Sequence, residues 1–158
     1  MNTQPASQPA PLTPQIVETL YTEALVLADE ARAAFDGAAP QNLADAAQPV
    51  SVALSIEGLR TTTRIMHILA WLLNQRAFMA GELNERQLRL HGALPKDRPT
   101  DTGQLDLLDP QICDLITQTR RLHARIARLD EQQRLDMSSD AAEPPVQLMQ
   151  DKLRSAFG

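Results

Sequence analysis

Aromatic residues are scarce in this chain of 158 residues, which has one Trp, one Tyr and three Phe. This composition disfavours a β-sheet protein, because strands are usually rich in aromatic and β-branched side chains. Helices are favoured instead, since Ala and Leu dominate the apolar residues and both have a high helix propensity. We therefore predict an all-α fold.

Cysteine and long apolar runs are also nearly absent. The single Cys113 has no partner for a disulfide within the chain, as is usual in a reducing compartment. The longest apolar run, from Ile68 to Leu73, is far shorter than the roughly 20 residues that a membrane span needs. The N-terminus has neither the basic start nor the apolar stretch of a secretion signal. We expect a cytoplasmic protein that does not insert into a membrane.

Sequence patterns of enzymes and of nucleic-acid binders are missing as well. The net charge of -5 disfavours binding to a phosphate backbone. There is no GxSxG motif, no P-loop and no Gly-rich dinucleotide turn in a chain with only six Gly. His67, His91 and His123 lie far apart, and no His forms an i, i+3 or i, i+4 pair with another His or with Cys113, so no metal site is predicted. We expect no catalytic residue and no cofactor.

The apolar spacing predicts three long helices over residues 14–36, 51–80 and 110–134. Thr13 before Pro14, and Asp109 before Pro110, are typical of a helix cap followed by the first helical residue. Three helices joined by loops predict an antiparallel three-helix bundle over residues 13–136.

The remaining segments are expected to be irregular or short. Residues 1–12 have almost nothing to bury and predict a disordered arm. Pro40 and Pro49 disfavour helix in the loop over residues 38–49, and residues 84–90 predict a turn or two of helix before a long polar crossover. Residues 137–158 predict a linker followed by a short amphipathic C-terminal helix.

The middle helix has more apolar surface than packing in one small core requires. With Met66 at the centre, one face gathers Leu59, Thr62, Leu69, Ala70, Leu73 and Ala77, and we expect this face to point into the core. A second strip contains Ile65, Ile68, Leu72 and Met79, which we predict to form the interface of a homodimer. In the alternative, the other two helices cover both strips and the chain is a monomer.

The third side of the same helix alternates cationic and aromatic residues. It contains Arg60, Arg64, His67, Trp71, Asn74 and Phe78. Trp and Arg are enriched at binding hot spots, and a cation over the Trp71 indole is geometrically available, so we predict partner binding by Arg60, Arg64, His67, Trp71 and Phe78. The alternative is structural: Arg60 pairs with Glu57, while Trp71 and Phe78 are core residues.

The third helix has a basic flank made of Arg121, Arg125 and Arg128. Positive charge near a helix C-terminus is favoured by the helix dipole and by exposure, so a solvated flank explains it. A docking strip for an acidic partner is the functional alternative.

Residues 57–83, EGLRTTTRIMHILAWLLNQRAFMAGEL, resemble the central pattern of the alphaproteobacterial RcdA family, the regulators of CtrA degradation. The residues that match are Glu57, Leu59, Arg60, Thr62, Thr63, Arg64, Met66, Trp71, Leu72, Leu73, Gln75, Arg76, Ala77, Gly81 and Glu82. Gly58, Thr61 and His67 depart from the pattern, which has Ser at the first of these positions and an apolar residue at the second.

The resemblance implies a small dimeric helical bundle that is not an enzyme but an adaptor for the ClpXP protease. Members of the family bind ClpXP primed by a response-regulator-like adaptor, and tether cargo or secondary adaptors that deliver CtrA. Tethering raises the effective concentration of a weakly bound substrate. The alternative is a structural dimeric scaffold, or a protein that localises a partner at the cell pole, without a role in proteolysis.

Overall fold

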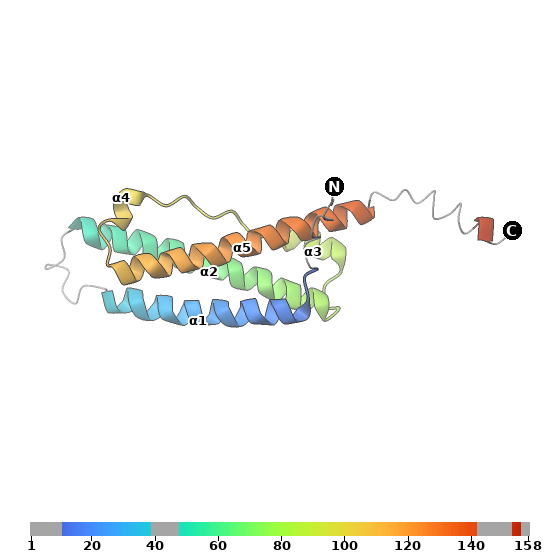
Figure 1. Ribbon diagram of the computed structural model, residues 1–158, viewed down its shortest axis with the longest axis horizontal. Coiled ribbons are helices and arrows are strands. Elements are labelled where there is room, and N and C mark those ends of the chain that lie inside the picture. The colour runs from blue at the N-terminus through green and yellow to red at the C-terminus, as the bar shows by residue number, and fades with distance from the viewer. Residues whose placement is uncertain (1–10, 39–47, 142–152, 156–158) are drawn as a thin grey trace, which may run out of the picture.

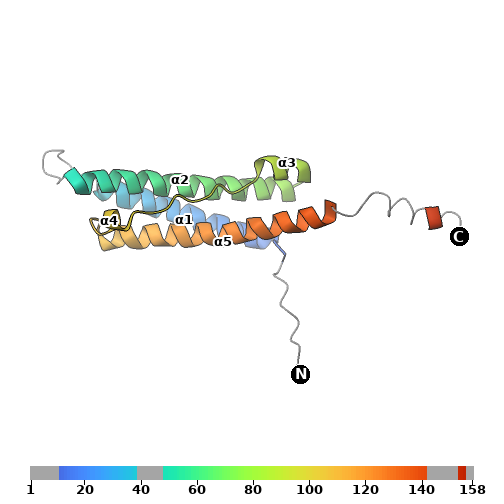
Figure 2. The same cartoon turned by 90° about the horizontal axis from the view of Figure 1, so that it is seen from above.

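The computed structural model describes residues 11–38, 48–141 and 153–155 of the chain. The helices are α1 (Pro14–Ala38), α2 (Gln48–Met79), α3 (Glu85–His91), α4 (Thr102–Leu105) and α5 (Pro110–Ala141), and the described residues contain no strand. Helices α1, α2 and α5 lie side by side in an elongated bundle (Figures 1 and 2). The predicted all-α bundle is confirmed.

The three long helices do not all alternate in direction, in contrast to the antiparallel order that was predicted. Helix α1 runs opposite to α2 and α5, whereas α2 and α5 run the same way (Figure 1). The reason is the segment from Gly92 to Asp101, here called the crossover, which has no helix and carries the chain back along the bundle between α3 and α4. The crossover therefore lies against α2 and α5, where its side chains can reach both.

The predicted caps explain where two of the long helices begin. The Thr13 Oγ1 accepts a hydrogen bond from the Ile16 amide at 3.3 Å, and the Asp109 Oδ1 accepts one from the Gln111 amide at 2.9 Å. Helix α2 begins earlier than expected, at Gln48, because the first turn of a helix tolerates Pro49, whose missing N–H is not needed there.

The ends of the helices correct two expectations. Helix α5 continues to Ala141, so residues 137–141 are helical rather than part of a linker. The short helix α4, which was not predicted, is capped by Asp101, whose Oδ1 accepts from the Gly103 amide at 2.9 Å. The arm predicted over residues 1–12, the loop over 38–49 and the C-terminal helix fall largely on residues 1–10, 39–47, 142–152 and 156–158, which lie outside the described residues.

The core is formed by one side of each long helix. Its main cluster contains Val17, Leu20, Ala24, Leu27, Ala31, Ile65, Ile68, Trp71, Leu72, Leu115, Leu122 and Ile126. A second cluster of Ala53, Leu108, Ile112 and Ile116 lies where α4 and the start of α5 pack against α2. This packing fixes the rotation of α2, and the other described residues leave the opposite side of α2 exposed. No helix in the described part of the chain is long and apolar enough to cross a membrane.

Candidate functional site

The α2 residues that were predicted to bind a partner, here called the strip, are partly buried and partly exposed in the fold. One of the buried residues is Arg64. Arg64 is 1% exposed. Its Nε donates to the Asp97 Oδ2 of the crossover at 2.9 Å, and its Nη1 donates to the Thr119 Oγ1 of α5 at 3.0 Å. The prediction that Arg64 binds a partner is wrong, because its guanidinium is enclosed by two other parts of its own chain.

Trp71 is also a core residue rather than a recognition residue. It is 2% exposed, and its Nε1 donates to the Asp130 Oδ1 of α5 at 2.9 Å. The other Asp130 oxygen accepts from the Leu94 amide of the crossover and from the Arg134 Nε, each at 3.2 Å. The functional prediction for Trp71 is wrong and its structural alternative is confirmed, since the indole joins α2 to α5.

The other members of the strip keep part of their surface exposed. Arg60 pairs with the buried Glu57 at 2.7 Å, as the structural alternative predicted, and its side chain is 27% exposed. His67 and Phe78 are half-buried. A cation was expected over the Trp71 indole. In the structure a cation lies over another ring: the Arg76 guanidinium is 4.8 Å from the centre of the Tyr21 ring on α1.

The residues assigned to a dimer interface are mostly enclosed by their own chain. Ile65 is 6% exposed, and Ile68 and Leu72 are fully buried in the main core cluster. Met79 is half-buried against the same cluster. The prediction of this interface is wrong, because α1 and α5 cover this apolar strip; the monomeric alternative required both apolar strips to be covered, and the strip centred on Met66 is not.

The face of α2 that was expected to point into the core lies on the surface instead. Of that face, Leu59 is 71% exposed, Met66 64% and Leu73 48%, whereas Leu69 packs against the main core cluster. Val52, one heptad before Leu59, is 55% exposed. These four exposed residues are Val52, Leu59, Met66 and Leu73. They recur every seven residues and alternate with Ile56, Thr63, Ala70 and Ala77. We call these eight residues the Met66 stripe. A spacing of four and three residues places them along one line of the helix, as at the seam of a coiled coil.

A cavity of about 430 Å³ lies beside the stripe, between α2 and the crossover. It is lined by Ile56, Leu59, Arg60, Thr63, Arg64, His67, Lys96, Asp97 and Arg98. Arg60 and Arg64 have acidic partners in Glu57 and Asp97, whereas His67, Lys96 and Arg98 make no ion pair or side-chain hydrogen bond with any described residue. Lys96 and Arg98 therefore border the stripe with positive charge that is not neutralised within the described bundle.

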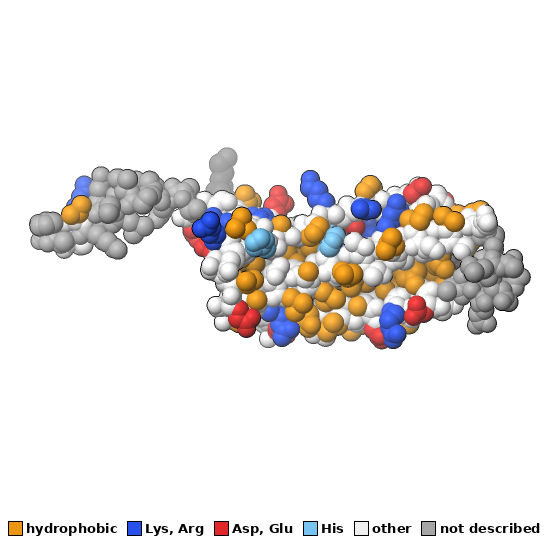
Figure 3. Space-filling view, turned by 180° about the vertical axis from the view of Figure 1, so that it is seen from behind, with side chains coloured by type: hydrophobic (Ala, Val, Ile, Leu, Met, Phe, Trp, Pro, Cys, Tyr) orange, Lys and Arg blue, Asp and Glu red, His pale blue; other side chains and the backbone are white. Residues whose placement is uncertain are grey.

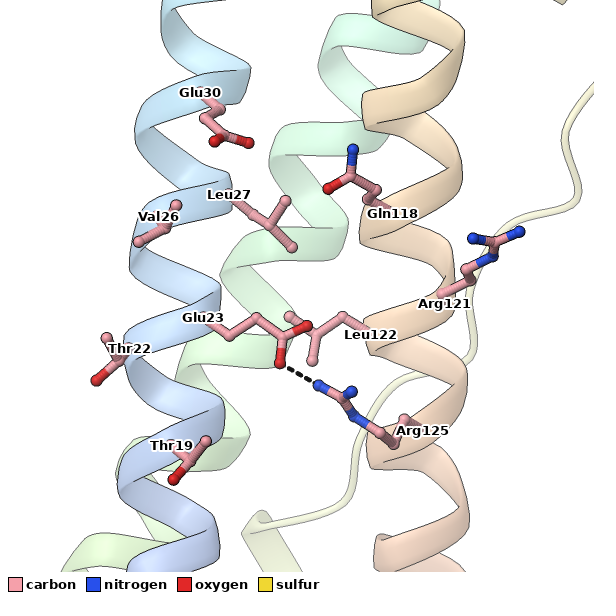
Figure 4. Close-up of a pocket in the computed structure, with 10 residues that line it drawn as sticks. All are labelled: Thr19, Thr22, Glu23, Val26, Leu27, Glu30, Gln118, Arg121, Leu122 and Arg125. Carbon is pink, nitrogen blue, oxygen red and sulfur yellow. Dashed lines mark hydrogen bonds and ion pairs between the residues drawn. The ribbon is translucent and has the colours of Figure 1, made fainter.

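The basic flank of α5 faces a second hollow, of about 680 Å³, between α1 and α5. Figure 4 shows Arg125 and Glu23 pointing toward one another across this hollow, where they form an ion pair, while Arg121 turns away from it. Arg121 and Arg128 are exposed, with no ion pair to a described residue. Arg125 thus has an acidic partner on α1, and the docking role of Arg121, Arg125 and Arg128 stays a prediction.

Chemical reactivity is suppressed at the lone cysteine. Cys113 is half-buried, with its Sγ 3.3 Å from the Leu105 carbonyl oxygen. Burial raises the pKa of the Cys113 thiol, and the nearby carboxylates of Asp114, Asp106, Asp109 and Glu57 raise it further. The thiol is a poor nucleophile for this reason. Among the described residues, no group of three or more His, Cys, Asp or Glu could bind a metal ion.

Comparison with known proteins gives one family and one related structure. Residues 9–157 match the family described as protein of unknown function (DUF1465). The chain also resembles the crystal structure of RcdA from Caulobacter crescentus CB15, with 25% sequence identity and a TM-score of 0.55 over 72% of this chain and 87% of that chain. No protein with a curated description matches. The resemblance to the RcdA family is confirmed.

Proposed function

This chain belongs to the family described as protein of unknown function (DUF1465), and we propose that it is a non-enzymatic adaptor that tethers substrates or other adaptors to the ClpXP protease. In this role it promotes the regulated degradation of cell-cycle regulators such as CtrA. Its partners are ClpXP primed by a response-regulator-like adaptor, and the protein cargo.

The single observation that supports this proposal is the likeness to RcdA over most of both chains. The exposed surface of the bundle also supports the proposal, because an adaptor needs exposed surfaces that contact other proteins rather than reactive groups that converge on a substrate. The Met66 stripe and the cations beside it are such a surface, and they extend along the whole middle of α2. By tethering cargo, the adaptor makes capture of a weak degradation tag nearly intramolecular.

A homodimer is part of the same proposal, but it needs a surface other than the one first assigned to it. Ile65, Ile68 and Leu72 cannot meet a second copy, because they are buried. Sedimentation equilibrium up to high micromolar concentration tests the dimer, and a persistent monomer would remove it.

The test of the adaptor function is a reconstituted degradation assay with purified ClpXP, the priming adaptor and CtrA or another candidate regulator. We expect the chain to accelerate loss of the substrate only when the priming adaptor is present. No acceleration for any candidate, under conditions where RcdA is active, would refute the proposal. Stable co-purification with partners that are never degraded would instead favour the scaffold or polar-localisation alternative.

A further inference from the structure

The Met66 stripe is an apolar surface that stays exposed in the described part of the chain. Four of its residues, Val52, Leu59, Met66 and Leu73, are each about half or more exposed, and they lie on one line over some 30 Å of helix at about 1.5 Å per residue. Contiguous exposed apolar surface of this kind usually marks an association site. Its heptad spacing matches the way one helix packs along another.

Charged side chains border this surface. Figure 3 shows apolar side chains spread over the face that α2 and α1 share, with charged side chains along its upper and lower edges. The edge of the stripe beside the crossover contains His67, Lys96 and Arg98, which have no partner among the described residues, whereas Arg76 on the other edge pairs with Glu18 of α1. In a chain whose net charge is -5, local cations without partners indicate a carboxylate-bearing ligand.

The α2 helix of a second copy does not supply those carboxylates. The residues that border the stripe along α2 are Ser55, Thr62, Leu69 and Arg76 on one side and Arg60, His67 and Asn74 on the other. None of them is acidic. If two copies packed along this stripe, the α2 of one would therefore place no carboxylate opposite the cations of the other.

We propose that the Met66 stripe binds an amphipathic helix of a partner protein, in which a row of apolar side chains is bordered by Asp or Glu. The apolar row packs on Leu59, Met66 and Leu73, and the carboxylates lie against Lys96, Arg98 and His67 at the cavity. This inference rests on the proposed adaptor function, because it specifies the chemistry of the partner that the adaptor recognises.

The test measures binding directly, without the protease. The probe is a fluorescein-labelled synthetic helix of about three heptads with Leu at positions a and d and Glu at e and g, and the matched control peptide has Lys in place of Glu. We expect fluorescence anisotropy to show binding of the acidic peptide that weakens with added salt, and at least about tenfold weaker binding of the basic peptide.

Variants of the chain identify the surface. Met66→Glu should weaken binding of the acidic peptide about tenfold or more, since it places a charge in the middle of the apolar contact. Lys96→Glu combined with Arg98→Glu should reverse the preference, so that the basic peptide binds better than the acidic one. Leu135→Glu is the matched control, because Leu135 is similarly exposed, at 58%, on α5. Circular dichroism checks that all variants stay folded.

Three outcomes would overturn the inference: equal binding of both peptides, binding that Met66→Glu does not change, or self-association of the chain that Met66→Glu abolishes. Failure of the adaptor function is a separate result. A chain that binds the acidic helix through the stripe, but never accelerates degradation, would refute the adaptor proposal and support this one.

Discussion

Replacing Asp130 with Ala should destabilise the bundle more than any other single carboxylate change on α5 for which the structure gives contacts. The Asp130 side chain accepts hydrogen bonds from Trp71 of α2, from the Leu94 amide of the crossover and from Arg134. It therefore joins three segments that are far apart in the sequence. Asp130 is 8% exposed, so water cannot fully replace these contacts.

The loss in the free energy of unfolding depends on how well water can solvate each hydrogen-bond donor once the Asp130 carboxylate is removed. The Trp71 N–H, on a side chain that is 2% exposed, would lose its acceptor at a cost of about 1–3 kcal/mol. The loss of the bond from the partly buried Leu94 amide costs less than this. The loss of the bond from Arg134 costs almost nothing, because that side chain is 35% exposed. The sum is about 2–4 kcal/mol, or a fall in Tm of roughly 5–12 °C for a chain of this size.

Urea unfolding, followed by the emission of the single Trp71 and by far-UV circular dichroism, measures this loss. The matched control is Asp136→Ala, because Asp136 is exposed on the same helix and its one hydrogen bond to a described side chain is with Gln132. Its effect should stay within about 0.5 kcal/mol. An Asp130→Ala variant as stable as this control would refute the reasoning, since it would mean that the three bonds contribute nothing. In the parent chain, Trp71 emission should be blue-shifted and resistant to quenchers.

Three further predictions concern other contacts of the fold. Arg64→Ala should lower the free energy of unfolding by about 2–3 kcal/mol in the same urea assay, because Asp97 would lose its buried partner and keep only the more distant Arg120, at 4.0 Å. Arg128→Ala on the exposed flank should have almost no effect. Gly92→Ala should lower the free energy of unfolding by about 1–3 kcal/mol, since a Cβ there would lie 2.6 Å from a backbone carbonyl oxygen. Gly37→Ala should raise it by about 0.5 kcal/mol, because a Cβ there meets nothing within 4 Å. Equal effects of the two changes would contradict this. The Cys113 pKa is raised above its ordinary value of 9.0, so iodoacetamide should alkylate the folded chain at pH 8 more slowly than the urea-unfolded chain. Because the raised pKa means that the unfolded thiol ionises first, the folded state should also lose stability as the pH rises above 9, and a rise in stability there would refute the assignment.

Apolar spacing alone predicted the fold class well, because helix caps and helix periodicity are local. Thr13 and Asp109 cap α1 and α5 through side chains only two or three residues from their partners. The rotation of α2 could not be predicted in the same way. Its buried side includes Glu57, Thr61, Arg64 and Gln75, polar residues that an apolar count assigns to the surface.

The burial of Arg64 could not be predicted, for the same physical reason. Arg64 is buried because Asp97 and Thr119 accept its hydrogen bonds, and these residues lie 33 and 55 positions away in the sequence. Nothing local in the pattern indicates such partners. The signal for the exposed face was nevertheless present, since Val52, Leu59, Met66 and Leu73 recur exactly one heptad apart, and such a row is typical of helix association as well as of a core.

The parallel course of α2 and α5 determines where the described bundle begins and ends. Pro11 and Leu12 border a hollow with Arg128 and Gln132, so the start of the described chain lies near the final turns of α5. Pro11 and Ala141, the ends of the described bundle, therefore lie toward the same end of a rod nearly 50 Å long, at about 1.5 Å per residue for the 32 residues of α5. A fusion partner or label joined directly at Pro11 or at Ala141 would sit at that end and leave the Met66 stripe open to ligand.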